Sequence, residues 1–88
     1  MRFSITRLCG GKALMVAPRD TVDIDLRKAA GILSDIGVIG SADDMMLTMS
    51  WNGMEVTVYA QGKIMFHPLD SRDDAVAYTN TLLEMLVG

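Results

Sequence analysis

Two short turns, close together in the sequence, restrict the fold of this chain more than any other feature. Asn52-Gly53 stands between two alternating segments, and Asn-Gly is the strongest short signal for a two-residue hairpin because both positions need a positive φ. Further on, Ala60-Gln61-Gly62 fits a three-residue hairpin loop whose glycine adopts the left-handed conformation. Residues 44–67 are therefore predicted to form three consecutive antiparallel strands.

Each turn fixes which residues face one another across its hairpin. The first turn pairs Trp51 with Met54, and the second pairs Tyr59 with Lys63. Counting outward from both turns collects a set of apolar residues on one face of the sheet, and a slip of one residue in either hairpin would mix that set with polar residues. This face is predicted to carry Leu47, Met49, Val56, Val58, Ile64 and Phe66. The opposite face is predicted to carry Met46, Thr48, Ser50, Glu55, Thr57, Tyr59, Lys63, Met65 and His67, joined by Ser4 and Thr6.

The N-terminal part adds one strand and a candidate for a second. Residues 2–8 alternate between apolar and polar side chains, which is typical of a half-buried strand. Residues 13–17 form a short apolar run that is a candidate second strand, ended by Pro18.

Two helices are predicted from helical spacing of apolar residues and from end signals. Asp20 and Thr21 are the expected caps of a first helix that runs to about Ile36. Ser71 is the expected cap of a second helix that reaches almost to Gly88.

The chain is therefore predicted to be one α+β domain, because 88 residues leave room for one domain and not two. The expected architecture is an antiparallel sheet of four to five strands with two helices packed on one face, in the order β-α-β-β-β-α. Each helix has one apolar stripe and the sheet has one apolar face, so they must cover each other. The other sheet face, rich in hydroxyl groups, is expected to stay open to water or to a partner.

The second hairpin and the helix start after it share a family pattern. Tyr59-Ala60-Gln61-Gly62-Lys63-Ile64-Met65, followed by Ser71-Arg72-Asp73-Asp74-Ala75, resembles one repeat of the TATA-box-binding protein family. That family has an aromatic residue, two small or polar residues, Gly-Lys and apolar residues in a hairpin, and then a Ser-Glu-Glu-type helix start. The resemblance covers about 30 residues, most of which are hairpin and cap chemistry. It implies a repeat that runs strand, helix, strands, helix.

The resemblance also implies roles for particular residues. Tyr59 occupies the position of a DNA-wedging phenylalanine, Met46 faces it as a second wedge would, and Lys63 matches a lysine near the DNA backbone. The chain departs from the family because members carry two tandem repeats, whereas this chain has room for one. The arginines and asparagine that members present on the sheet have no counterpart, and Glu55 adds a negative charge. These departures disfavour DNA binding through this face.

Charge is unevenly distributed along the chain. The formal net charge is −3, with six basic and three acidic residues up to Lys28 and two basic and eight acidic residues after it. Proteins that neutralise nucleic-acid phosphates are usually basic overall. A phosphate-binding role for the whole domain is therefore disfavoured.

The apolar content favours association with a protein. Hydrophobic residues make up 50% of the chain and the mean hydropathy is +0.27, so a subunit interface is the simplest place for the excess. We expect a small non-enzymatic interaction or assembly module, either a homodimer or a subunit of a complex. Aromatic residues and methionine are enriched at interfaces. The candidate anchors, on the open sheet face or at the Trp51–Met54 edge, are Met46, Trp51, Met54, Tyr59 and Met65.

The first alternative is nucleic-acid or anion binding, through the basic N-terminal part or the open sheet face. Backbone N–H groups in a glycine turn, helped by nearby cations, can bind an anion. The candidate patch consists of Arg7, Gly10, Gly11 and Lys12.

The second alternative is a small ligand-binding or thiol-dependent domain. Cys9 lies beside a glycine turn and Lys12, and a nearby cation favours the thiolate. His67 faces Glu55 in the predicted register, an arrangement that can support acid–base chemistry. A structural thiol and a solvated cross-strand pair are the commoner interpretations of these residues.

Several site types and locations are disfavoured by the sequence. A single cysteine excludes an intrachain disulfide and a four-cysteine metal site, and no residue pattern calls for a cofactor. The N-terminus has no apolar segment of signal-peptide length, and no apolar run is long enough to cross a membrane. The expected location is the cytoplasm, without a membrane partner.

Overall fold

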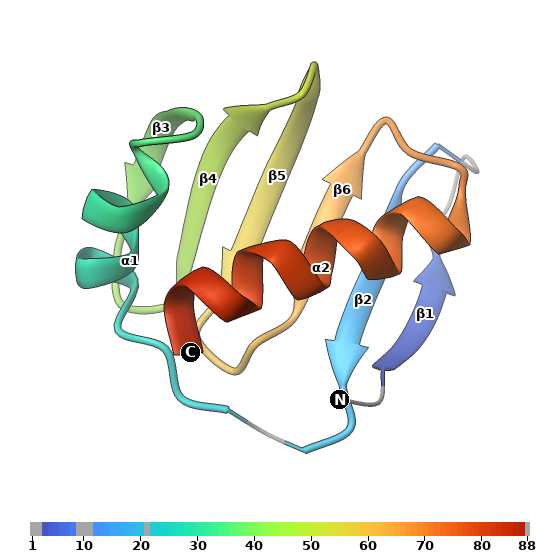
Figure 1. Ribbon diagram of the computed structural model, residues 1–88, viewed down its shortest axis with the longest axis horizontal. Helices are drawn as coiled ribbons and strands as arrows, with labels where there is room; N and C mark the ends of the chain where they lie inside the picture. The colour runs from blue at the N-terminus through green and yellow to red at the C-terminus, as the bar shows by residue number, and fades with distance from the viewer. Residues whose placement is uncertain (1–2, 9–11, 21, 88) are drawn as a thin grey trace.

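A computed structural model describes residues 3–8, 12–20 and 22–87 of the chain. The described residues form an α+β fold with a six-stranded open antiparallel sheet in the order β1-β2-β6-β5-β4-β3 and two helices (Figure 1). Along the chain the elements are β1 Phe3–Arg7, β2 Leu14–Pro18, α1 Leu26–Leu33, β3 Val38–Ala42, β4 Met46–Trp51, β5 Met54–Tyr59, β6 Ile64–His67 and α2 Arg72–Val87.

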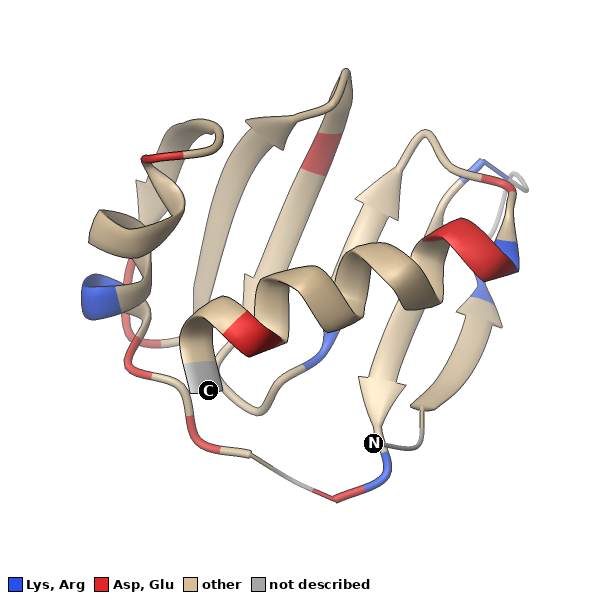
Figure 2. Ribbon diagram, in the orientation of Figure 1, with Lys and Arg blue, Asp and Glu red and all other residues tan. Residues whose placement is uncertain are grey.

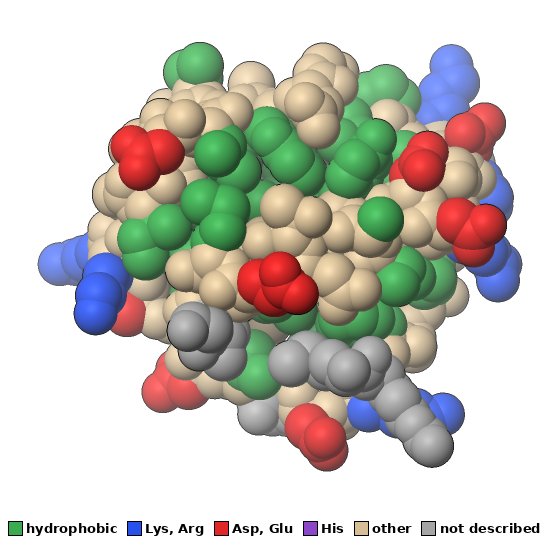
Figure 3. All heavy atoms as spheres, viewed as in Figure 1, with side chains coloured by type: hydrophobic (Ala, Val, Ile, Leu, Met, Phe, Trp, Pro, Cys, Tyr) green, Lys and Arg blue, Asp and Glu red, His purple; other side chains and the backbone are tan. Residues whose placement is uncertain are grey.

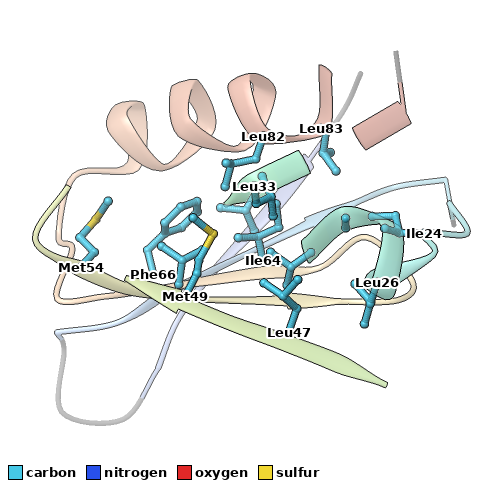
Figure 4. Close-up of a cluster of buried hydrophobic side chains, with 14 of the residues drawn as sticks. Ile24, Leu26, Leu33, Leu47, Met49, Met54, Ile64, Phe66, Leu82 and Leu83 are labelled. Atoms are coloured by element: carbon cyan, nitrogen blue, oxygen red, sulfur yellow. The ribbon is translucent and has the colours of Figure 1, made fainter. Parts of the chain in front are cut away.

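Both helices lie on the same face of the sheet. Helix α2 begins on the β1–β2 side and crosses in front of the central strands, and α1 lies at the β3–β4 end (Figure 1). A side view shows the same two layers, with the helices above the sheet and the labelled side chains between them (Figure 4). We call the side of the sheet under the helices the covered face and the other side the open face.

The two predicted hairpins and their registers are confirmed. Asn52 and Gly53 have φ angles of 52° and 75°, as a two-residue turn with two positive φ values requires, and Gly62 has φ 102°. Trp51 pairs with Met54 across the first turn, and every further pair of β4 with β5 follows from it. Across the second turn the Tyr59 N–H donates to the Lys63 carbonyl over 2.8 Å, so this register is also as predicted.

The core lies between the covered face and the helices. The six apolar residues assigned to this face are each at most 1% exposed, and they belong to one cluster with residues of both helices. Phe66 is fully buried in this cluster (Figure 4), and its ring centroid lies 6.0 Å from that of Tyr78 in α2. The predicted burial of Leu47, Met49, Val56, Val58, Ile64 and Phe66 is confirmed.

The prediction of four to five strands in the order β-α-β-β-β-α is wrong in number. The described order is β-β-α-β-β-β-β-α, because the candidate strand near Pro18 is β2 and a further strand, β3, follows α1. Strand β3 pairs with β4, but the register shifts between Ile39 and Ser41. This bulge interrupts the alternation by which a strand is recognised in a sequence.

Helix α1 is shorter than predicted and begins later. Asp25 is its N-cap, and its carboxylate accepts hydrogen bonds from the backbone N–H groups of Arg27 and Lys28 over 3.2 and 3.3 Å. The predicted cap Asp20 precedes the helix, and Thr21 lies outside the described residues. Residues 22–24 instead run beside the loop between β5 and β6, where the Ile24 N–H donates to the Ala60 carbonyl over 2.9 Å.

Helix α2 begins as predicted. The Ser71 hydroxyl accepts a hydrogen bond from the Asp74 N–H over 3.2 Å, which satisfies one of the free donors of the first turn. Ala75, Thr79 and Leu82 are fully buried and direct the inner side of the helix to the sheet. The buried side of this helix therefore forms the upper half of the core.

Candidate functional site

The open face has one row of side chains that crosses all six strands. Successive cross-strand partners define this row, from β1 to β3. The central row consists of Thr6, Met15, Met65, Thr57, Thr48 and Ser41. No helix in the described part of the chain lies against it (Figures 1 and 4).

Side chains in the middle of the central row shield one another from water. Thr57 is 2% exposed although it points away from the helices, because Thr48 and Met65 flank it on the neighbouring strands. The hydroxyls of Thr48 and Ser41 share a hydrogen bond of 2.9 Å. The face assignment of Thr57 follows the predicted register, but its burial was not expected from the sequence.

Two further rows flank the central one, and each contains one charged residue. One row holds the carboxylate of Glu55, with His67 and Ser50 as its cross-strand neighbours and Val38 at the β3 edge. The other row, on the opposite side of the central row, holds Lys63. Its further members are Ser4, Ala17, Tyr59 and Met46. The open face is thus close to neutral, with its negative and positive charges at opposite ends of the strands.

The predicted interface anchors are divided between the two faces. Met46, Tyr59 and Met65 are half-buried members of the open face. Met54 is 7% exposed and belongs to the core. The Trp51 ring lies on the covered face in a T-shaped contact with Tyr78, at 5.2 Å between centroids. The Trp51–Met54 edge therefore packs under α2.

A second apolar area exists on the side of the helices. Hydrophobic side chains gather there in the space between α1 and α2, over β4 and β5 (Figure 3). Ile36, three residues after α1, is 37% exposed. Most of this area is the upper surface of the core cluster, so it is already in contact with both helices.

The two described members of the predicted anion patch, Arg7 and Lys12, lie beside Asp70. The Arg7 guanidinium donates to the Asp70 backbone carbonyl over 3.2 Å. Lys12 and Asp70 line a surface hollow of about 420 Å³ next to the start of α2, where Asp73 follows. Basic and acidic residues are interspersed at this end of the molecule (Figure 2). The other two residues of the predicted patch, Gly10 and Gly11, lie outside the described residues.

The structure describes one of the two candidate reactive side chains, His67. Cys9 lies outside the described residues. His67 pairs with Glu55 as predicted, but it is exposed at the end of β6. Within the described ranges, no group of three His, Cys, Asp or Glu residues could hold a metal ion. No helix found in those ranges is long and apolar enough to cross a membrane.

One carboxylate has an altered acidity. The Asp43 carboxylate accepts hydrogen bonds from the backbone N–H groups of Met46 and Met45, over 2.9 and 2.8 Å, and these bonds lower the pKa of Asp43 below its ordinary value. Nearby Arg27 acts in the same direction. The arrangement stabilises the β3–β4 turn at the edge of the sheet.

Met15 is a member of the central row that the sequence predictions did not include. The sequence predicts its strand only as a candidate and therefore assigns it no cross-strand partners. The alternation of Leu14 and Val16 with Met15 and Ala17 is the signal that could have placed it, because strand neighbours point to opposite faces.

No family model, curated protein or solved structure matches this chain. The resemblance to one repeat of the TATA-box-binding protein family therefore stays a prediction.

Proposed function

We propose that this domain is a non-enzymatic interaction module that binds a protein surface through its open sheet face. It acts either as a homodimer or as a subunit of a complex. The observation that carries this proposal is the central row, in which Met15, Met65 and Thr57 form a tightly packed strip that no described helix covers.

The chemistry of the open face supports a protein partner. Methionine side chains are flexible and polarizable and adapt to the shape of a partner surface. Tyr59 adds a ring with a polar end, a type of residue enriched at interfaces. Methionines Met15, Met46 and Met65 thus give this hydroxyl-rich face an apolar centre, and such exposed apolar areas mark interaction sites.

The charge on the open face favours a protein over nucleic acid. A surface that binds phosphates presents several cations, and its affinity falls steeply with salt. The three rows of the open face hold one carboxylate, Glu55, and one ammonium group, Lys63. A nearly neutral face of this kind can be covered by a protein surface without a large electrostatic cost.

The test compares two substitutions that each introduce one lysine at an apolar position. Met65→Lys places the charge in the central row, and Ile36→Lys places it beside α1 on the other side of the sheet. Both residues are partly accessible, so each variant is expected to fold, which circular dichroism checks. Sedimentation velocity at micromolar concentration, followed by capture of stoichiometric partners, measures assembly.

We expect the wild-type chain to assemble, with itself or with a partner at a fixed ratio. Met65→Lys should abolish this assembly, and Ile36→Lys should retain it. A wild-type chain that is a strict monomer and captures no stoichiometric partner would overturn the proposal. Assembly that persists in folded Met65→Lys would do the same.

A further inference from the structure

We infer that the occupant of the open face is a second copy of this chain, stacked face to face about a two-fold axis that runs along the central row. This inference rests on the proposed function, because it requires the open face to be the contact surface. It adds the identity of the partner and the geometry of the pair.

The size of the open face requires a dimer to use nearly all of it. The sheet has six strands of four to six residues, which at about 3.3 Å per residue and about 4.8 Å between strands gives a face of about 24 × 17 Å. This is about 400 Å², or about half of the area that each partner buries in a standard protein–protein interface. A contact that used only part of the face would bury still less. The two copies must therefore overlap over most of the sheet.

Nearly full overlap restricts the position of the symmetry axis. The partners in a two-fold interface present the same surface to each other, and the axis of two stacked faces lies in the plane between them. The central row is the middle one of three, so an axis along it overlays the two faces most completely. Residues on the axis, including Met65 and Thr57, then face their own counterparts.

The distribution of charge selects this axis over one parallel to the strands. An axis along the central row exchanges the two flanking rows, so Glu55 of one copy lies over the row that holds Lys63 of the other. An axis parallel to the strands would instead bring each flanking row onto itself and place the two Glu55 carboxylates at the same end of the interface. Opposite charges that meet across an interface fix its register, and like charges penalise it. The positions of Glu55 and Lys63 therefore favour the axis along the central row.

Within one chain these two residues do not form an ion pair. Glu55 lies four positions before Tyr59, the residue that is bonded to Lys63, so their rows are about 14 Å apart along the strands. Stacking a second copy brings each charge to a partner that it lacks in the monomer. The two faces can pack as aligned sheets, which keep their strands within about 30° of each other.

A charge-exchange experiment tests the geometry directly. Glu55→Lys places a lysine over the partner's Lys63, and Lys63→Glu places a glutamate over the partner's Glu55. Each single variant should weaken dimerisation at least tenfold, measured by sedimentation equilibrium. The double variant Glu55→Lys/Lys63→Glu restores opposite charges across the interface and should return the dissociation constant to within threefold of the wild-type value. Glu84→Lys, an exposed charge change on α2, is the matched control and should change it less than twofold.

A cross-linking experiment tests the face and the axis independently. In a Cys9→Ser background, Met65→Cys places a thiol near its own counterpart on the axis. A bismaleimide with a two-carbon spacer should join the two chains in high yield. Met46→Cys is the control on the same face, because the two copies of position 46 lie about 14 Å apart along the strands on opposite sides of the axis. This variant should give little product.

The outcomes separate this inference from the proposed function. A wild-type chain that stays monomeric but binds a different protein through the open face overturns the inference and leaves the proposed function standing. A second result overturns the geometry alone. In it, Met65→Lys abolishes the dimer, but the double variant Glu55→Lys/Lys63→Glu does not recover the affinity that the two single variants lose. If the open face of the wild-type chain binds neither a second copy nor another protein, both the inference and the proposed function are overturned.

Discussion

The two faces of the sheet are built from the same strands but differ in what lies over them. In β5 the consecutive residues Val56, Thr57 and Val58 are all buried, although the two valines point to the helices and the threonine points away from them. The valines are covered by the apolar stripes of α1 and α2, whereas Thr57 is covered only by its neighbours on adjacent strands. Burial alone therefore does not distinguish the core from a contact surface. The difference lies in whether another layer of the chain is present.

The largest expected difference between the faces comes from truncating neighbouring residues of β6. Phe66→Ala removes a fully buried ring that contacts Tyr78, and it should destabilise the domain by about 3–5 kcal/mol. Met65→Ala removes a side chain of the open face and should cost less than about 1 kcal/mol in the monomer, because no helix loses a contact. Urea unfolding of both variants at low protein concentration measures the two free energies. Equal losses would mean that the two faces contribute equally to the folded monomer.

A smaller effect is expected from exchanging the side-chain types of Val58 and Thr57. Val58→Thr places a hydroxyl among the apolar side chains of the core and should lower the free energy of unfolding by about 1–3 kcal/mol. Thr57→Val keeps the shape on the open face and should change the stability of the monomer by less than about 0.5 kcal/mol. Chemical denaturation checks both values. A larger loss for Thr57→Val than for Val58→Thr would reverse the assignment of the faces.

One polar group on the covered face is expected to reduce stability. The Thr79 hydroxyl is buried and has no hydrogen-bond partner among the described residues. Thr79→Val replaces it with a methyl group of similar volume and helix propensity, and it should raise the free energy of unfolding by about 1 kcal/mol.

Thr81→Val is the matched control, because Thr81 is exposed on the same helix and donates to the Ala77 carbonyl over 3.1 Å. Its effect should stay within about 0.5 kcal/mol. A destabilising Thr79→Val would show that the hydroxyl makes a favourable interaction in solution. Thermal unfolding of both variants distinguishes these results.

The smallest effect is expected at the β3–β4 turn, at the far edge from β1. Asp43→Ala removes the acceptor of two backbone hydrogen bonds and should lower the melting temperature slightly, whereas Asp43→Asn keeps an accepting oxygen and should lower it less.

The pH dependence of stability tests the role of the Asp43 charge in this turn. The pKa of Asp43 is lowered by the hydrogen bonds from Met46 and Met45, so its charge stabilises the fold above its ordinary pKa of 3.8. This contribution is lost as the pH falls through the lower pKa of the folded state. The difference between wild type and Asp43→Asn should therefore be present at pH 7 and vanish near pH 2. A difference that does not change with pH would exclude the charge as its cause.

The sequence predicts the centre of the sheet well because two turns with strict backbone requirements fix it. Asn52 and Gly53 set one register, Gly62 sets the other, and the face of each residue between them follows by counting. The same count places Trp51 with Leu47 on the covered face. Its selection as an interface anchor followed residue type and not register.

The edges of the sheet and the start of α1 are less predictable from the sequence. The bulge near Gly40 removes the alternation of β3, and β2 pairs with β6, a strand far along the chain to which no direct turn joins it. The start of α1 depends on a tertiary contact, since the segment before Asp25 is held by the β5–β6 loop. A local cap signal at Asp20 cannot anticipate that contact.

The methionines provide the most direct test of the central claim, that one face is core and the other packs against a second copy of the chain. Methyl spectra of the protein are recorded with a soluble paramagnetic agent at low and high protein concentration, with exposed Met45 as the internal reference for free access. We predict that Met49 and Met54 stay protected at both concentrations, whereas Met15 and Met65 broaden at low concentration and become protected at high concentration. Broadening of Met49 and Met54, or equal broadening of Met15 and Met65 at both concentrations, would contradict it.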